Sequence, residues 1–102
     1  MLIHLEEQKF ENVVATKLCL VDFYATWCGP CRMLAQEFEL INETTNDFDI
    51  VKVDIDEFPE LAQQFSIEVV PTMIVFKDGK PTETITGYRT KDELISIMQK
   101  YI

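Results

Sequence analysis

Two cysteines, Cys28 and Cys31, are separated only by Gly29 and Pro30 and directly follow Trp27. Two thiols at this spacing can close into a disulfide and reopen, so the pair can exchange two electrons with another disulfide. The chemistry depends on which sulfur is a thiolate, because only the thiolate attacks. The motif therefore predicts a reversible redox centre whose reactivity is set by the elements around it.

A strand and a helix are expected to hold this motif in place. Residues 18–25 are apolar and rich in strand formers, which predicts a buried central strand. Apolar residues recur at helical spacing from about 29 to about 44, and Pro30 suits the first turn of that helix. Cys28 then lies at the helix N-terminus, where free N–H groups and the helix dipole favour a thiolate. We expect Cys28 to be the exposed, lower-pKa nucleophile and Cys31 the resolving thiol.

Length and composition argue for a single domain and against some classes of function. The 102 residues suit one domain, 1–102, with 47% hydrophobic residues to build its core. A net charge of −9, from 18 acidic and 9 basic residues, argues against nucleic-acid binding. No apolar run is long enough for a membrane span, and the first residues lack a secretory signal, so we expect a cytoplasmic protein.

The three glycines lie too far apart for a phosphate-binding loop. We therefore expect no bound cofactor beyond a redox-active disulfide, so that the electrons come from a protein with its own nucleotide or flavin. The alternative use of two cysteines is a zinc site, which needs four ligands. The only further candidate zinc ligands are Cys19, in the middle of a predicted strand, and His4, near the N-terminus. We therefore expect no metal. A cysteine within a buried strand, as Cys19 is predicted to be, behaves as a small hydrophobe.

The rest of the chain alternates strands and helices before it closes with a hairpin and a helix. Strands are expected over 2–5, 50–55 and 82–86, and helices over 6–14, 58–65 with Asp56 as N-cap, and 92–102. Leu94, Ile95, Met98 and Ile102 form the apolar face of the last helix. The apolar run 67–76 is broken by Pro71, and Asp78-Gly79 predicts a tight turn. Two neighbouring strand–helix units imply parallel pairing.

Taken together, these segments resemble the thioredoxin family, nearly end to end. The resemblance rests on residues 21–23, 27–31, 52–54, 70–72 and 77–79, and on Gly87, in the order and spacing of that family. It implies an α/β fold with a mixed five-stranded sheet flanked by four helices. It also implies a general protein-disulfide reductant that acts on disulfide-containing proteins and is re-reduced by thioredoxin reductase. A monomer is the default for such a carrier.

Asp22 is an acid within an otherwise apolar strand. If it is buried and unpaired, burial raises its pKa, and the resemblance implies that it takes the proton of Cys31. The alternative is an acid at a solvated sheet edge. By resemblance Lys52 neighbours Asp22 and tunes it by charge, while the alternative there is an ordinary exposed lysine.

The resemblance also implies a docking surface for an extended substrate chain, formed by Trp27, Gly29, Pro30, Val70 and Gly87. Pro71 is expected to be cis, to pack against the disulfide and to leave the backbone of Val70 free. Local departures from the family pattern occur at Tyr24, Arg32, Gln36, Thr86 and Tyr88. Tyr24 replaces a tryptophan that many relatives carry.

Two other functions stay open on the sequence. The same fold supports a disulfide oxidant or isomerase, although Gly29-Pro30 between the cysteines resembles the reducing members of the family. A thioredoxin-like accessory subunit with a non-catalytic role is the second. The presence of both Cys28 and Cys31 argues against a purely structural role.

Overall fold

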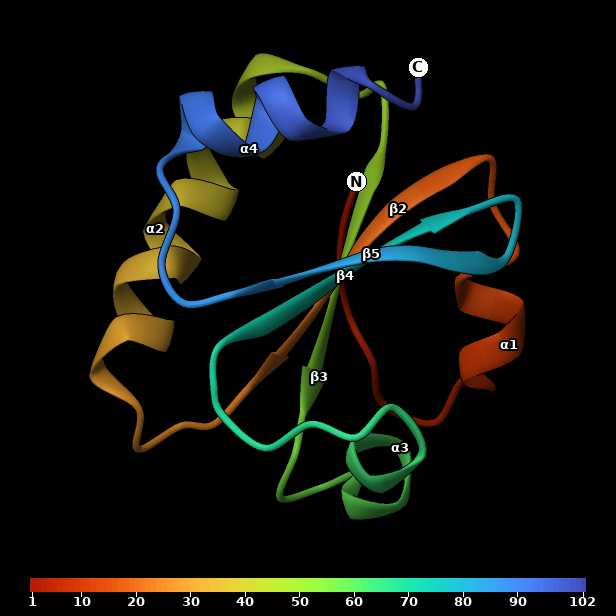
Figure 1. Cartoon of the computed structure of the whole chain (residues 1–102), viewed down its shortest axis with the longest axis vertical. Coiled ribbons are helices and arrows are strands. Elements are labelled where there is room, and N and C mark those ends of the chain that lie inside the picture. The colour runs from red at the N-terminus through yellow and green to blue at the C-terminus, as the bar shows by residue number, and fades with distance from the viewer.

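A five-stranded sheet with strand order β1-β3-β2-β4-β5 forms the centre of the computed structural model, which describes all residues from 1 to 102 (Figure 1). Its strands are β1 (Leu2–His4), β2 (Leu18–Tyr24), β3 (Asp49–Asp54), β4 (Thr72–Lys77) and β5 (Lys80–Thr86). The helices are α1 (Phe10–Val13), α2 (Gly29–Thr44), α3 (Pro59–Gln64) and α4 (Lys91–Gln99). The predicted mixed sheet of five strands flanked by four helices is confirmed.

The central strand β2 joins a parallel half of the sheet to an antiparallel half. β2 pairs in parallel with β3, as the sequence predicts, and β3 also pairs in parallel with β1. β4 runs antiparallel to both β2 and β5. The connection from β2 to β3 crosses over through α2, since parallel neighbours need a long crossover. The carboxyl end of β2, which leads into the cysteine motif, therefore leaves from the middle of the sheet.

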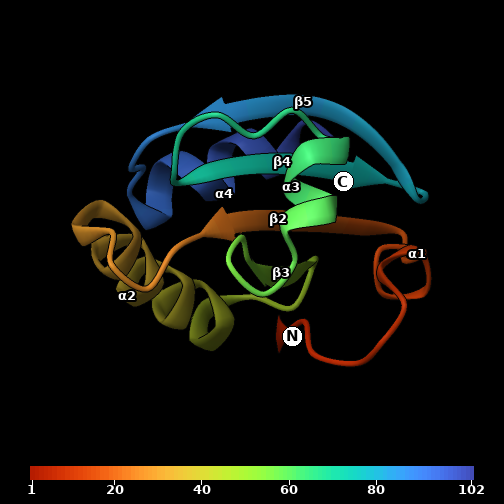
Figure 2. The same ribbon diagram turned by 90° about the horizontal axis from the view of Figure 1, so that it is seen from below.

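Two helices cover each face of the sheet (Figures 1 and 2). On the α2 and α4 face, Leu20 packs with Phe38 and Leu94. On the α1 and α3 face, Val21 packs with Phe10. Because successive strand side chains point to opposite faces, the even-numbered residues 18–24 of β2 face α2. Asp22 is thereby placed under the helix that carries both cysteines.

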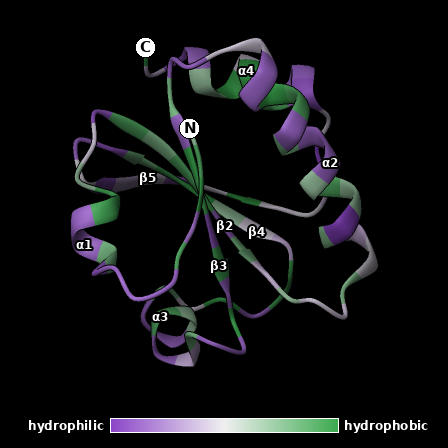
Figure 3. Cartoon of the chain, turned by 180° about the vertical axis from the view of Figure 1, so that it is seen from behind, coloured by the Kyte–Doolittle hydropathy of each residue, from purple (hydrophilic) through white to green (hydrophobic).

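Hydropathy follows this layering. In Figure 3 the hydrophobic colour concentrates along the central strands and on the inner sides of the helices, while the outer helix surfaces are largely hydrophilic. No helix combines the length and the apolar character that crossing a bilayer requires.

The first helix is shorter than predicted. α1 covers only Phe10–Val13, whereas the acidic first turn of the predicted helix 6–14 is not helical. Residues 6–9 are exposed, and the side chain of Gln8 accepts the amide N–H of Glu6 at 2.7 Å. A short helix gains its stability from tertiary packing, so it forms only where Phe10 reaches the core.

The cap of α3 also differs from the prediction. Phe58 is the N-cap residue and makes no side-chain cap, so the predicted cap at Asp56 is wrong. The amide of Asp56 instead donates to the carboxylate of Asp54 at 2.9 Å.

The closing helix begins one residue earlier and ends three residues earlier than predicted. Thr90 caps α4 in a capping box with Glu93, which fixes its start at Lys91. Leu94 and Met98 are buried, but Ile102 lies beyond the helix and is exposed, so its predicted place on the apolar face is wrong.

The hairpin is confirmed by its backbone. Asp78 and Gly79 have φ of 52° and 81°, as a tight Asp-Gly turn requires. β5 extends back to Lys80, and within the apolar run 67–76 the strand β4 starts only after Pro71. The remaining boundaries lie close to those predicted.

Candidate active site at the N-terminus of α2

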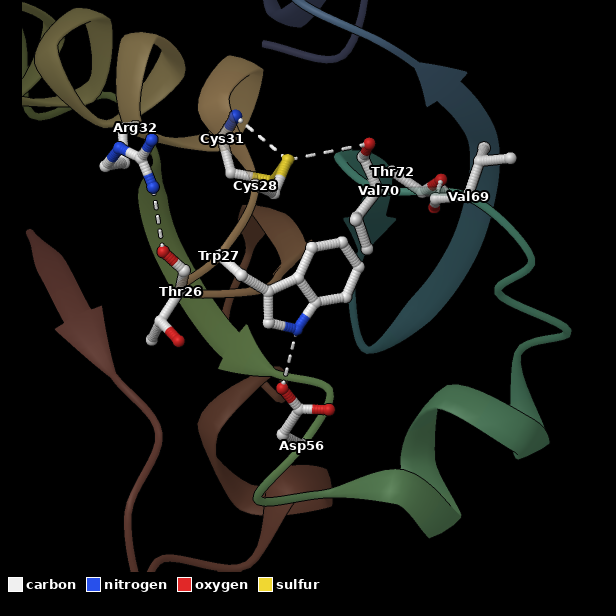
Figure 4. Close-up of a disulfide and its surroundings, with 9 residues drawn as sticks. All are labelled: Thr26, Trp27, Cys28, Cys31, Arg32, Asp56, Val69, Val70 and Thr72. Carbon is white, nitrogen blue, oxygen red and sulfur yellow. Dashed lines mark hydrogen bonds between the residues drawn. A yellow bond between two sulfur atoms is a disulfide. The ribbon is translucent and has the colours of Figure 1, made fainter.

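Cys28 and Cys31 form a disulfide at the first turn of α2, with their Cα atoms 5.2 Å apart (Figure 4). Cys28 is the N-cap residue, and its Sγ accepts a hydrogen bond from the amide N–H of Cys31 at 3.2 Å. Gly29 begins the helix and Pro30 lies in its first turn, as predicted. Free N–H groups at a helix N-terminus stabilise negative charge, so this position favours a thiolate on Cys28 after reduction.

Cys28 is less exposed than predicted. It retains 6% of its accessible surface and Cys31 retains 2%, so both belong to the buried residues. Tyr24 and Val70 pack against the small cluster that these cysteines form with Ala25. Cys28 is nevertheless the more accessible of the two, which agrees with its expected role as the attacking sulfur.

The loop before β4 lies directly across from Cys28. The Val70-Pro71 peptide bond is cis, as predicted, and Pro71 is buried. The Sγ of Cys28 lies 3.7 Å from the carbonyl oxygen of Val70, a contact that a reduced Cys28 thiol can turn into a hydrogen bond (Figure 4). The carbonyl oxygen of Pro71 accepts the amide N–H of Gly87 at 2.9 Å, which brings the loop after β5 to the same edge.

Gly87 has a φ of 86°, a conformation that favours glycine.

Thr72 contributes to the loop before β4, and the sequence did not reveal this. Its hydroxyl, which is buried, donates to the carbonyl oxygen of Val69 at 2.7 Å. A threonine directly after a strand-breaking proline is a weak signal, because its partner can be identified only from the turn geometry.

Trp27 is the exposed aromatic side chain of the site. It keeps 66% of its accessible surface, and its indole N–H donates to the carboxylate of Asp56 at 3.1 Å (Figure 4). Asp56 is thus a second residue whose place in the site the sequence did not reveal. The guanidinium of Arg32 donates to the carbonyl oxygen of Thr26 at 3.0 Å, which ties the start of α2 to the loop after β2.

Asp22 is fully buried, so the alternative of an acid at a solvated sheet edge is wrong. Neither carboxylate oxygen has a hydrogen-bond partner in the protein. Burial raises the pKa of Asp22 to about 7, and the nearby positive charge of Lys52 offsets only part of this effect. A carboxyl group that titrates near neutrality is suited to accept and release a proton.

Lys52 faces Asp22 across the β2–β3 pair, in register. Only 8% of Lys52 is exposed, so the reading of an ordinary surface lysine is wrong. No ion pair forms between the two residues; the ammonium lies instead 4.4 Å from the centre of the Tyr24 ring.

Cys19 and His4 lie away from this site. Cys19 is fully buried on the opposite face of β2, where burial, with a smaller contribution from Asp49, raises its pKa to about 12. His4 ends β1 at the surface. No group of three or more histidine, cysteine or acidic side chains is placed to hold a metal ion.

A cysteine pair that closes a disulfide at a helix N-terminus, on a mixed sheet, defines a thiol–disulfide oxidoreductase. The sequence matches the family model Thioredoxin over residues 1–100. It is 44% identical to the thioredoxin of Listeria monocytogenes over 100% of both chains, and 42% identical to that of Chlamydia trachomatis over 93% of each.

Solved structures agree with the sequence relatives. A mutant thioredoxin from Halobacterium salinarum superposes with a TM-score of 0.90 at 34% identity, over 98% of this chain and 89% of that one. The oxidised thioredoxin of Plasmodium falciparum gives a TM-score of 0.86 at 31% identity, over 99% and 98%. The chain belongs to the thioredoxin family.

Proposed function

We propose that this protein is a cytosolic dithiol reductant of protein disulfides, in which Cys28 attacks and Cys31 resolves. The observation that carries the proposal is the hydrogen bond from the Cys31 amide to the Cys28 Sγ at the N-terminus of α2. It gives Cys28, and not Cys31, the environment that favours a thiolate.

The reaction begins with the dithiol form. The Cys28 thiolate attacks one sulfur of a substrate disulfide, which forms a bond between Cys28 and that sulfur and releases the other as a thiolate. The buried carboxylate of Asp22 then takes the proton of the Cys31 thiol. The Cys31 thiolate attacks the Cys28 sulfur and displaces the second substrate thiolate. The substrate gains two electrons, and Cys28 and Cys31 are left joined by a disulfide.

The exposed ring of Trp27 and the loop at Val70 give a substrate a place to dock. Val70 takes part in no backbone hydrogen bond. Its carbonyl oxygen faces the Cys28 Sγ at 3.7 Å, and its amide N–H is free to bind an extended chain. Gly29 and Pro30 begin α2 directly after Cys28, and the amide of Gly87 donates to the Pro71 carbonyl, so none of them adds a large side chain beside this surface. We assign Pro71 and Lys52 supporting roles, at the loop and beside Asp22.

The oxidised protein needs two electrons to return to the dithiol form. We propose that a thioredoxin reductase supplies them and that the protein works as a monomer in the cytoplasm. One structural relative comes from work on the thiol resolving mechanism in a yeast mitochondrial 1-Cys peroxiredoxin via glutathione/thioredoxin systems. This supports a disulfide-bearing protein as the class of substrate.

Two variants test the order of attack. With a disulfide-bonded substrate protein, Cys31→Ser is expected to accumulate a mixed disulfide through Cys28, because the resolving thiol is gone, whereas Cys28→Ser should accumulate none. Mass spectrometry of the trapped species reads the result. Trapping through Cys31 in Cys28→Ser would overturn the assignment.

The reduction potential of the pair, measured against thiol buffers, separates a reductant from an oxidant or isomerase. A value nearer to about −270 mV than to about −180 mV supports the reductant. A value at the upper end, from about −180 to −120 mV, would contradict it in favour of a protein that donates or shuffles disulfides.

A further inference from the structure

Lys52 is positively charged, nearly buried and next to a buried acid, yet it does not pair with that acid. Asp22 and Lys52 are register partners on neighbouring parallel strands. The even-numbered positions of β2 and β3 lie on the same face of the sheet, under α2. An ammonium group at this position would ordinarily satisfy a neighbouring carboxylate. Both oxygens of Asp22 nevertheless lack any protein partner.

The Tyr24 ring explains where the ammonium goes instead. The Lys52 Nζ lies 4.4 Å from the centre of this ring and 6.0 Å from that of Phe38 on α2. An ammonium within about 6 Å of an aromatic ring centre is attracted by the electron-rich face of the ring. The ring is half-buried and lies two residues after Asp22 on the same strand, so it is fixed beside the acid.

We propose that Tyr24 is a positioning residue, whose ring holds the ammonium of Lys52 and keeps it from pairing with Asp22. Tyr24 also packs against the cluster that contains Cys28 and Cys31, so it links the charge of Lys52 to the redox pair. The inference rests on the proposed role of Asp22 as the proton acceptor for Cys31, and explains how that carboxyl stays unpaired beside a cation. A direct Asp22–Lys52 pair would hold the carboxylate charged and make it a poor acceptor at neutral pH.

The groups that act electrostatically on this part of the sheet come from three elements. They are Lys52 and Asp54 of β3, Tyr24 of β2, and Glu57 after β3, while α2 contributes Cys28 and Cys31, which are uncharged as a disulfide and become titratable only after reduction. The β4 neighbour of Asp22 is Met73, which is uncharged. Lys52 is the only cation among them, so its distance from Asp22 decides how much of the effect of burial on the Asp22 pKa is offset.

The test follows the ionisation of Asp22 directly, by ¹³C NMR of its carboxyl group in the oxidised protein. Tyr24→Phe keeps the ring and should leave the pKa of Asp22 unchanged. Tyr24→Leu removes the ring and should lower that pKa by about one unit or more, because Lys52 can then approach the carboxylate. The same substitution in a Lys52→Met background should lower it no further.

Two results would overturn the inference. One is an unchanged pKa of Asp22 in Tyr24→Leu; the other is an equal drop in the Lys52→Met background, which would mean that water had entered the space left by the ring. If Tyr24→Leu does not fold, pentafluorophenylalanine at position 24 keeps the ring shape but removes its attraction for cations. It should lower the pKa of Asp22 relative to Tyr24→Phe, and no difference between the two would count against the proposal.

The rate at which Cys31 resolves a mixed disulfide is measured as a function of pH in the same variants. A profile that shifts with the pKa of Asp22 supports both the inference and the role of Asp22 as acceptor. A pKa that shifts while the profile does not supports the positioning by Tyr24 and overturns the proton-transfer role.

Discussion

The indole N–H of Trp27 donates to the carboxylate of Asp56 across 3.1 Å, although 29 positions separate the two residues. This bond orients an aromatic side chain that keeps 66% of its surface exposed. Exposed aromatic side chains beside a reactive group are common contact points for protein partners. The bond therefore holds the Trp27 ring in one orientation while leaving its surface exposed to a docking partner.

Asp56→Ala is expected to free the Trp27 ring and to raise the KM for a disulfide-bonded protein substrate about two- to fivefold, with kcat little changed. This corresponds to about 0.5–1 kcal/mol, the usual contribution of one hydrogen bond. Asp56→Asn is the matched control, since its amide oxygen still accepts the indole N–H. Trp27 is the only tryptophan, so fluorescence reports its environment directly. Equal KM values in both variants would contradict the docking role.

Asp22 should make the protein less stable as the pH rises. Its pKa is about 7 in the folded state against an ordinary value of 3.8, so the unfolded chain loses this proton first. The stabilisation that the neutral acid provides is complete below about pH 4, declines between pH 4 and 7, and is absent above that range. The shift corresponds to about 4 kcal/mol at most.

Asp22→Asn is therefore expected to raise the free energy of unfolding of the oxidised protein by about 2–4 kcal/mol at pH 8 and to change it little at pH 4. Denaturant unfolding at the two pH values measures both effects. A gain of equal size at pH 4 and pH 8 would show that packing, and not ionisation, is responsible.

Much of the active site could be predicted because its signals are local. The cysteine spacing, the apolar strand before it and the apolar repeat after it lie within residues 18–44, and together they placed Cys28 at a helix N-terminus. The apolar residues on both sides of Asp22 favoured its burial, although a solvated sheet edge stayed open as the alternative. These features depend on side chains close together in the chain, where periodicity is informative.

What the sequence did not reveal depends on contacts between distant segments. Asp56 was predicted to cap α3, but its carboxylate accepts the Trp27 indole, a contact that no local pattern contains. The length of α1 was decided by whether Phe10 reached the core rather than by acids suited to a first helical turn. Tertiary packing overrides such local preferences.

Cys19 should be inert toward alkylating reagents in the folded protein. It is fully buried and its pKa is raised to about 12, so almost none of it is thiolate at pH 8. In the reduced protein, mass spectrometry after treatment with iodoacetamide should find Cys19 unmodified until denaturant is added. Cys28→Ser with Cys31→Ser isolates its signal. Modification of Cys19 in the native double variant would indicate that β2 opens locally.

Thr90 should contribute to stability although it lies outside the proposed site. Its side chain accepts the amide N–H of Glu93 at 3.2 Å, and the Glu93 carboxylate accepts the amide N–H of Thr90 at 3.0 Å. Thr90→Ala is expected to lower the free energy of unfolding by about 1 kcal/mol, because the first turn of α4 loses its cap.

Thr90→Ser is the matched control, because serine supplies the same hydroxyl and should keep most of that stability. Thr90→Gly should lose only a few tenths of a kcal/mol, since glycine suits the N-cap backbone. Urea unfolding of the three variants measures the order. Because α4 packs Leu94 and Met98 onto the same core as α2, a loss in Thr90→Ala larger than about 2 kcal/mol would mean that α4 also sets the position of α2. The rate of disulfide exchange in Thr90→Ala then shows how far such a displacement of α2 extends. An unchanged rate would mean that only the core packing is disturbed. A reduced rate would mean that the N-terminus of α2, where the cysteines lie, has moved as well.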